Sequence, residues 1–309
     1  MTPSDFEDEL TSIHIDYDQV IRAREVILAL YDRAARRRNP VCLFVTGDTG
    51  SGKTTIAERV EAEILSRQTD PNTCPVALVS VPARCTSKAL LSAILVALDH
   101  PDPYKGSQTL FEQRLVKWAR RKGVRMIMLD EAQHLVNPKN ASKNYDVADV
   151  IKVVINQLKI TLILVGDHGV DALCKNRQLF RRLRRRFRLT PFGYETEKEQ
   201  ARFCAFLLKY DVALPFSEYC HLSSPALAAA LFRATGGLVG WVVQLIWVAT
   251  DYALEENARR IEPRHLAEAW HEIRAPYQPN EPNPFRTVAI PGPKPKARRS
   301  GPDELRADA

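Results

Sequence analysis

Apolar and polar positions alternate between two kinds of segment in the chain up to Gly193. Short apolar runs rich in β-branched residues predict strands buried on both faces, and the longer segments between them carry apolar residues at helical spacing. These apolar runs span residues 41–46, 76–81, 124–129 and 161–165, and residues 186–189, which precede Thr190-Pro191-Phe192, are expected to form the last strand. Because strands alternating with helical crossovers pair in parallel, we expect an α/β domain with a doubly wound parallel sheet.

The predicted helices of this part span residues 17–38, 54–66, 88–98, 109–122 and 147–158. The first one precedes the sheet and ends in a basic run followed by Asn39-Pro40, a pair that stops a helix. We expect this helix to pack against the sheet domain. Docking of a partner is the alternative.

Beyond Gly193 the pattern is helical only, with predicted helices at residues 196–210, 224–235, 238–256 and 263–273. This predicts a separate all-helical domain. From Ala275 the chain is rich in Pro, Gly, Lys and Arg with few apolar residues, which predicts a disordered tail. The expected regions are therefore an N-terminal helical segment (1–39), an α/β domain (40–194), a helical domain (195–274) and a tail (275–309).

Composition narrows the class of protein. A net charge of +7 and an isoelectric point near 9.1 indicate a polyanionic partner. The six cysteines form no C-x-x-C pair, so we expect free thiols in a reducing compartment. No apolar run reaches the ~18 residues of a spanning helix, and the N-terminus lacks a signal-peptide pattern. We expect a cytoplasmic protein with no membrane partner.

Residues 47–54 have the sequence G-x-x-x-x-G-K-T and lie between the first strand and a helix, as a phosphate-binding P-loop requires. Its backbone N–H groups form an anion cradle for the β- and γ-phosphates of a nucleotide. Lys53 adds a mobile charge, and the Thr54 hydroxyl is the expected Mg²⁺ ligand. The predicted nucleotide-binding residues are Gly47, Thr49, Gly50, Ser51, Gly52, Lys53, Thr54, Thr55 and Asp130.

Two carboxylates follow the predicted strand at residues 124–129, in the manner of a Walker B element. Asp130 is expected to accept a hydrogen bond from Mg²⁺-bound water, so that it completes the Mg²⁺ site with Thr54. Glu131 is placed where a carboxylate polarises the attacking water as general base.

The P-loop followed by Asp130-Glu131-Ala132-Gln133-His134 resembles the AAA+ ATPases, and residues 14–273 are similar to the TniB/TnsC family of transposition ATPases. Supporting stretches are Val81-Pro82, Thr86-Ser87, Leu164-Val165-Gly166 and Gly237-Leu238-Val239-Gly240. The resemblance implies an AAA+ fold with a C-terminal helical lid, ATP and Mg²⁺ as cofactors, and self-assembly into a ring or helical filament with ATP between subunits.

The resemblance also implies an arginine that reaches the γ-phosphate of the neighbouring subunit. The basic run at residues 180–187 lies where this class keeps it, with Arg182 as first choice and Arg185 and Arg181 as close alternatives. Guanidinium suits this role because its planar, permanently charged donors match a loose phosphoryl transition state.

Two positions depart from the family pattern. Asp167 stands where a neutral sensor residue is usual, and it either orients water or caps a helix. Trp241 follows Gly240 in the lid, where a basic residue is common, and it can pack but cannot donate charge to a phosphate. Both departures are compatible with slow ATP hydrolysis that mainly holds an assembly together.

The resemblance places duplex DNA against the region after the second strand. The matching residues are Arg84, Thr86, Ser87 and Lys88, with Lys105, Lys139 and Lys143 as a fringe. Such groups contact phosphates without reading the bases, so we expect sequence-independent, salt-sensitive binding.

The predicted function is an ATPase that oligomerises on duplex DNA and links a target-selector protein to a transposase. Two alternatives remain at this point. One is a replication-initiator or secretion-type AAA+ ATPase, and the other is a P-loop kinase acting on a small molecule.

Overall fold

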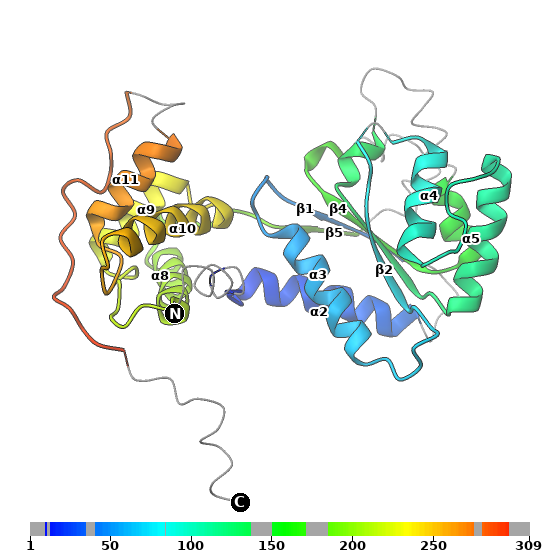
Figure 1. The fold of residues 1–309 in the computed structure, drawn as a ribbon, viewed down its shortest axis with the longest axis horizontal. Coiled ribbons are helices and arrows are strands. Elements are labelled where there is room, and N and C mark those ends of the chain that lie inside the picture. Colours follow the sequence, from blue (N-terminus) through cyan, green and yellow to red (C-terminus); the bar gives the residue numbers. More distant parts are fainter. Residues whose placement is uncertain are drawn as a thin grey trace, which may run out of the picture. The chain divides into compact units, whose positions relative to one another are not determined.

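The computed structural model describes Leu10 and residues 13–34, 41–83, 85–136, 150–170, 185–274 and 280–296. The chain divides into two compact units. We call residues 18–190 the sheet body, and residues 1–17 together with 191–309 the helical body. Figure 1 shows the elements of both, and each is described by itself below.

The sheet body contains a five-stranded, all-parallel sheet with the strand order β2-β3-β4-β1-β5. The strands are β1 (Cys42–Thr46), β2 (Val76–Ser80), β3 (Met126–Asp130), β4 (Thr161–Gly166) and β5 (Arg185–Arg188). Each lies within about two residues of its predicted position. The predicted doubly wound parallel sheet is confirmed.

The helices of the sheet body are α2 (Asp18–Ala34), α3 (Lys53–Ser66), α4 (Ser87–Ala97), α5 (Gln108–Lys122), the short 3-10 turn η1 (Ala132–Leu135) and the π-helical turn η2 (Val154–Leu158). Helix α2 packs against α3 and β4, and α4 packs against α5 (Figure 1). The prediction that the first helix packs against the sheet domain is therefore confirmed.

Side chains of the sheet alternate between two covered faces, because successive residues of a strand point to opposite sides. One face joins α4, α5 and η2 in a single core through Phe44, Ala77, Val79, Ile127, Leu129, Leu162 and Leu164. The intervening residues are also buried: Leu43, Val45, Met126, Met128, Ile163 and Val165. Burial on both faces explains why these strands read as continuous apolar runs.

The strand register brings the carboxyl ends of the strands to one edge of the sheet. Thr46 pairs with Gly166 on one side and with Arg188 on the other, and Ser80 pairs with Asp130. The loops after β1, β3 and β4 therefore start at the same edge. Open α/β sheets bind their ligands at this edge.

The helical body contains α8 (Glu197–Ala213), α9 (Pro225–Thr235), α10 (Val239–Glu255) and α11 (Pro263–Arg274). Thr196 and Glu199 close a capping box at the start of α8, where each side chain accepts from the other's backbone N–H. Gly236 and Gly237 turn the chain between α9 and α10 with positive φ angles of 59° and 73°. The predicted all-helical domain is confirmed.

Gly237 also allows a close crossing of two segments. A Cβ atom there would lie 2.3 Å from the carbonyl oxygen of Phe192, and the Phe192 N–H donates to the Gly237 carbonyl at 2.9 Å.

Among the residues that the structure describes, no single helix has the length and apolar composition needed to cross a membrane. Helices α9 and α10 meet that test only as a pair, bent by 113°.

The prediction of a disordered tail from residue 275 is wrong for residues 280–296. Phe285 is 1% exposed in the core of the helical body. The Tyr219 N–H donates to the Lys294 carbonyl at 3.0 Å, and the Lys296 N–H donates to the Ser217 carbonyl at 2.9 Å. One aromatic anchor and a few backbone hydrogen bonds therefore hold a segment whose average composition is typical of disorder.

The predicted N-terminal segment also divides differently. Leu10, Ile13, Ile15 and Tyr17 belong to the core of the helical body, whereas α2 belongs to the sheet body. The domain boundary therefore falls between residues 17 and 18. Composition alone did not reveal it, because the apolar partners of these residues lie far away in the sequence.

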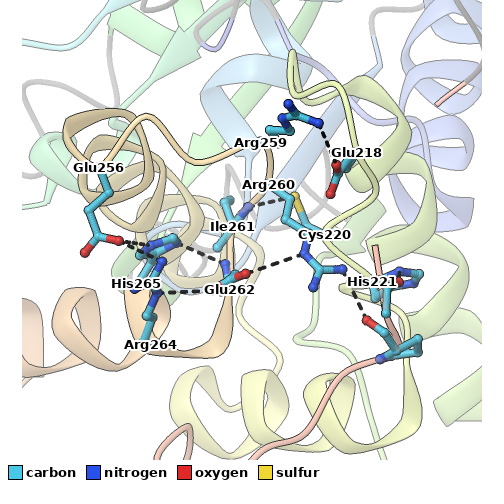
Figure 2. A network of polar contacts seen from close by, with 12 residues as sticks. Glu218, Cys220, His221, Glu256, Arg259, Arg260, Ile261, Glu262, Arg264 and His265 are labelled. Carbon is cyan, nitrogen blue, oxygen red and sulfur yellow. Dashed lines mark hydrogen bonds and ion pairs between the residues drawn. The ribbon is translucent and has the colours of Figure 1, made fainter. Parts of the chain in front are cut away.

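A network of polar contacts lies before and within the first turn of α11 (Figure 2). His265, which is 1% exposed, contacts the Glu256 carboxylate at 3.1 Å and accepts from the Glu262 N–H at 3.0 Å. Arg264 pairs with both glutamates at 2.8 and 3.0 Å. Because these groups satisfy one another, the network reads as structural.

Candidate nucleotide-binding site

The loop after β1 has a backbone that requires glycine at three positions. Gly50 and Gly52 have φ angles of 79° and 81°, which lie in the left-handed region. At Gly47 a Cβ atom would lie 2.6 Å from the Ser51 hydroxyl and 2.9 Å from the Leu189 carbonyl oxygen. The motif glycines thus permit a tight turn that leads directly into α3, whose first residues are Lys53, Thr54 and Thr55.

Lys53 is half-buried and lies over its own loop. Its Nζ donates to the carbonyl oxygens of Gly47 at 3.0 Å and Asp48 at 2.8 Å. Burial lowers the pKa of Lys53. Four carboxylates act in the opposite direction, in order of decreasing effect: Glu131, Asp130, Asp167 and Asp48. The ammonium group therefore lies over its own loop, and the carboxylates at and after the ends of β3 and β4 offset the effect of its burial on its pKa.

The two halves of the predicted magnesium site meet. The Thr54 hydroxyl donates to Asp130 Oδ2 at 2.7 Å, and Asp130 Oδ1 accepts from the Glu131 N–H at 2.9 Å. A hydroxyl oxygen and a carboxylate oxygen at one point, beside a phosphate-binding loop, fit Mg²⁺, which takes oxygen ligands and keeps several waters. The residues present therefore suit the ion.

Glu131 stands at the turn between β3 and η1, with a φ of 55° that is unusual for a non-glycine residue. Its carboxylate accepts a hydrogen bond from Gln133 Nε2. Uncommon backbone conformations of this kind cluster at functional sites. The predicted general base thus lies one residue beyond the predicted magnesium ligand, at the carboxyl edge of the sheet.

The structure favours one of the two interpretations of Asp167. Its Oδ1 accepts from the Gly169 N–H at 2.6 Å, which caps the short turn after β4. Trp241 in the helical body lies under the Arg274 guanidinium, 5.2 Å from the ring centre. Trp241 therefore packs against a cation, which agrees with the expectation that it can pack but cannot donate charge to a phosphate.

The candidate arginines are placed only in part. Arg181 and Arg182 lie outside the described residues. Arg185 is exposed and begins β5, where it pairs with Leu43 near the start of β1. It therefore lies at the opposite end of the strand from its own P-loop. This position does not serve the loop of the same chain, and a role toward a neighbouring subunit stays a prediction.

The predicted DNA contacts differ in their exposure. Arg84, Lys139 and Lys143 lie outside the described residues, and Lys88 is exposed, with Nζ 5.6 Å from the centre of the Phe111 ring. Thr86 caps α4, its hydroxyl accepting from the Ala89 N–H at 3.2 Å. Ser87 is only 4% exposed. The burial of Ser87 does not support a DNA contact by its hydroxyl, because the first turn of α4 directs that side chain inward.

Gln133 is a residue of the site that the motif contains but to which no role was assigned. Its side chain contacts both Glu131 and the backbone after β4. The only sequence signal for Gln133 was its position two residues after Glu131.

In the described residues, no group of three or more His, Cys, Asp or Glu side chains is arranged to hold a metal ion.

Comparison with known proteins identifies the family and the fold. A family model described as "Bacterial TniB protein" matches residues 11–194. A search of curated proteins found no match. The Aeropyrum pernix ORC2 protein, solved as ADPNP-ADP complexes, is similar with a TM-score of 0.65 and 18% identity over 86% of this chain and 71% of that chain.

Two further similar structures contain DNA. The Aeropyrum pernix ORC1 protein in complex with DNA has a TM-score of 0.60 and 21% identity, over 82% of this chain and 64% of that chain. Drosophila ORC bound to DNA has a TM-score of 0.59 and 16% identity, over 90% and 70%. At these identities the likeness shows the fold alone. It confirms the AAA+ fold class with a C-terminal helical domain.

Proposed function

The chain belongs to the TniB family of bacterial proteins, and from this premise we propose that it is an ATP-dependent, DNA-binding regulator of transposition. It assembles on duplex DNA when ATP is bound, as a ring or a helical filament. The assembly acts in the cytoplasm and links the protein that selects a target to the transposase.

One observation carries the ATPase part of this proposal. The hydrogen bond between Thr54 and Asp130, at 2.7 Å, joins the P-loop helix to the end of β3 and sets Glu131 beside both. A phosphate cradle, a pair of hard oxygen ligands and a carboxylate base are the parts that phosphoryl transfer to water requires.

In this proposal each residue of the site has its own role. The loop N–H groups and Lys53 bind the phosphates, so that the Lys53 donors move from the carbonyls of Gly47 and Asp48 to phosphate oxygens. Thr54 and Asp130 would hold Mg²⁺, which would neutralise negative charge at the transferred phosphate. Glu131 accepts the proton of the attacking water.

An arginine of the neighbouring subunit completes the site in this proposal. Arg182, or Arg185 from the start of β5, stabilises the charge that develops on the γ-phosphate. ATP then acts as a joint between subunits as well as a substrate. Hydrolysis then breaks the contact between neighbouring subunits, and the assembly dissociates from the DNA.

Net positive charge supports binding to DNA, since Lys and Arg side chains neutralise phosphates. Among the described residues, we propose that Lys88 and Thr86 at the start of α4 contact the phosphate backbone of the DNA. The presence of DNA in two structures of the same fold is consistent with this role.

Phosphate release, measured with and without duplex DNA, tests the proposal. We expect DNA to stimulate release, and electron microscopy to show rings or filaments when ATP and DNA are both present. Monomers alone under these conditions would contradict assembly. Transfer of phosphate to a small acceptor rather than to water would favour the kinase alternative.

A further inference from the structure

The Gln133 side chain connects two strand ends of the sheet body. Its Nε2 donates to the Glu131 carboxylate, and its Oε1 accepts from the Asp167 N–H at 3.2 Å. Glu131 follows β3 and Asp167 follows β4, which is the next strand in the sheet. The amide of Gln133 therefore bridges the predicted base and the neighbouring loop.

The chemistry of the two partners determines how the amide is oriented. A backbone N–H only donates, so the group that faces Asp167 is the oxygen of Gln133. An ionised carboxylate only accepts, so the group that faces Glu131 is the nitrogen. Only an amide of this length satisfies both partners at once. A glutamate at position 133 accepts from Asp167 but has no donor for Glu131.

Gly166 provides the space for this bridge. A Cβ atom at Gly166 would lie 2.5 Å from Gln133 Oε1 and 2.8 Å from Val170 Cγ2. Both separations are shorter than a non-bonded contact, so an alanine would displace the Gln133 side chain. Gly166 has no positive φ that would require glycine for its backbone. The need for glycine at the end of β4 is therefore steric, and it comes from Gln133 together with Val170 and the Ala132 backbone.

The bridged residue Glu131 lies next to the contact between β3 and the phosphate-binding loop. Among the carboxylates that raise the pKa of Lys53, Glu131 has the largest effect, ahead of Asp130 and Asp167. Asp130, the residue before Glu131, accepts from the Thr54 hydroxyl of the P-loop helix at 2.7 Å, so Glu131 lies beside the P-loop while Gln133 holds its carboxylate.

We propose that Gln133 is a positioning residue for ATP hydrolysis, which holds the Glu131 carboxylate toward the P-loop and couples it to the loop after β4. This inference rests on the proposed ATPase function. Gln133 does not touch the reacting atoms and acts through Glu131.

Steady-state hydrolysis by Gln133→Ala tests the proposal. Because a base that loses its orientation still occupies the site, we expect kcat to fall by about 10- to 100-fold. We expect KM and the affinity for a non-hydrolysable ATP analogue to stay within about twofold, since no nucleotide-binding group is removed. Gln133→Glu has the same shape but cannot donate, and we expect it to lose at least as much kcat.

Two further variants separate positioning from a general loss of structure. Gly166→Ala displaces the Gln133 side chain but also crowds the buried Val170, so we expect kcat to fall in the same range and the unfolding midpoint to fall below that of Gln133→Ala. His134→Gln is the matched control, because His134 lies in the same turn but contacts the Val81 carbonyl oxygen at 3.1 Å instead of Glu131. We expect its kcat to equal that of the wild type.

The outcomes distinguish the inference from the proposed function. A wild-type protein that neither binds nor hydrolyses ATP would overturn both the proposed function and the positioning role. Wild-type hydrolysis with full kcat in Gln133→Ala or in Gln133→Glu would overturn the positioning role alone. Faster hydrolysis in Gln133→Ala would also overturn it, because the amide would then restrain Glu131. A parallel loss of analogue affinity and of thermal stability would show a structural role instead.

Discussion

Each body contains a buried aspartate, and the two aspartates have different roles. Asp130 in the sheet body is 6% exposed and Asp211 in the helical body is 1% exposed. Asp211 accepts from the N–H groups of Cys220 at 2.9 Å and Leu222 at 3.2 Å, and Lys296 Nζ lies 4.0 Å away. Asp130 instead contacts Thr54 in the first turn after the P-loop.

The comparison shows that burial of a charge does not by itself mark a functional site. Asp211 ties together distant parts of its own chain, as Lys296 also donates to the Leu214 carbonyl at 2.8 Å. Asp130 lies beside an exposed loop whose backbone suits an anion. Substitutions in the sheet-body site are therefore expected to change catalysis and binding, whereas those around Asp211 are expected to change stability.

The largest effect is expected from Glu131→Gln. The amide keeps the shape of the side chain but does not accept a proton, so hydrolysis should fall by ~10²–10⁴-fold. ATP binding should persist, and complexes with DNA should live longer because the ATP state is trapped. Single-turnover hydrolysis and the dissociation rate from labelled duplex DNA measure both. Normal turnover would remove Glu131 as the base.

Asp211→Ala should destabilise the helical body by about 3–5 kcal/mol, because the buried backbone N–H groups of Cys220 and Leu222 lose their charged acceptor. Urea unfolding measures this change by tryptophan fluorescence. In a Trp118→Phe background the remaining tryptophans, Trp241, Trp247 and Trp270, all lie in the helical body.

Glu218→Ala is the control for Asp211→Ala. Glu218 pairs at 3.8 Å with Arg259, whose side chain is 80% exposed, so its loss should cost less than about 1 kcal/mol. ATP affinity should be unchanged in both variants. A loss of ATP affinity in Asp211→Ala alone would break the division between the two bodies.

Lys53→Ala should weaken ATP binding by about 100-fold, since charge-assisted hydrogen bonds to two phosphates contribute ~1.5–3 kcal/mol each and part of this is recovered by water. Nucleotide-dependent assembly on DNA should be lost with it. Titration with a fluorescent ATP analogue measures the affinity. Unchanged binding would contradict the role given to Lys53, and an unchanged unfolding midpoint without nucleotide would show that the fold is intact.

The smallest effect is expected from Ser87→Ala. The Ser87 hydroxyl is buried and has no hydrogen-bond partner in the part of the chain that the structure describes. Its removal should stabilise the sheet body by about 1 kcal/mol and leave DNA affinity unchanged. Unfolding followed by Trp118 fluorescence and a DNA titration test both. Weaker DNA binding would restore the hydroxyl as a DNA contact.

Local sequence patterns predicted most of the sheet body. Strands β1, β3 and β4 are buried on both faces and β2 nearly so, so each of these four reads as an apolar run, whereas β5 is mostly exposed and basic. The P-loop glycines are required by the local backbone at Gly50 and Gly52. The meeting of Thr54 with Asp130 was also predictable, since both follow strands whose carboxyl ends share an edge.

Contacts between distant segments were not predictable in the same way. The Gln133 bridge depends on β3 and β4 being neighbours, which the order of strands in the sequence does not reveal. Phe285 was overlooked because its neighbours in the sequence are polar or proline, while its packing partners belong to the helices. Average composition describes such a segment poorly when a single aromatic side chain anchors it.

The scattered core of the helical body has a consequence for synthesis on the ribosome. The sheet body is continuous from residue 18 to residue 190, whereas the helical core includes both Leu10 and Phe285. At ~5–20 residues per second, roughly 15–55 s separate the translation of these two residues. The sheet body is therefore synthesised completely before the helical body. Leu10 and its apolar neighbours are translated early, and the helical core that they join is complete only after Phe285 has been translated.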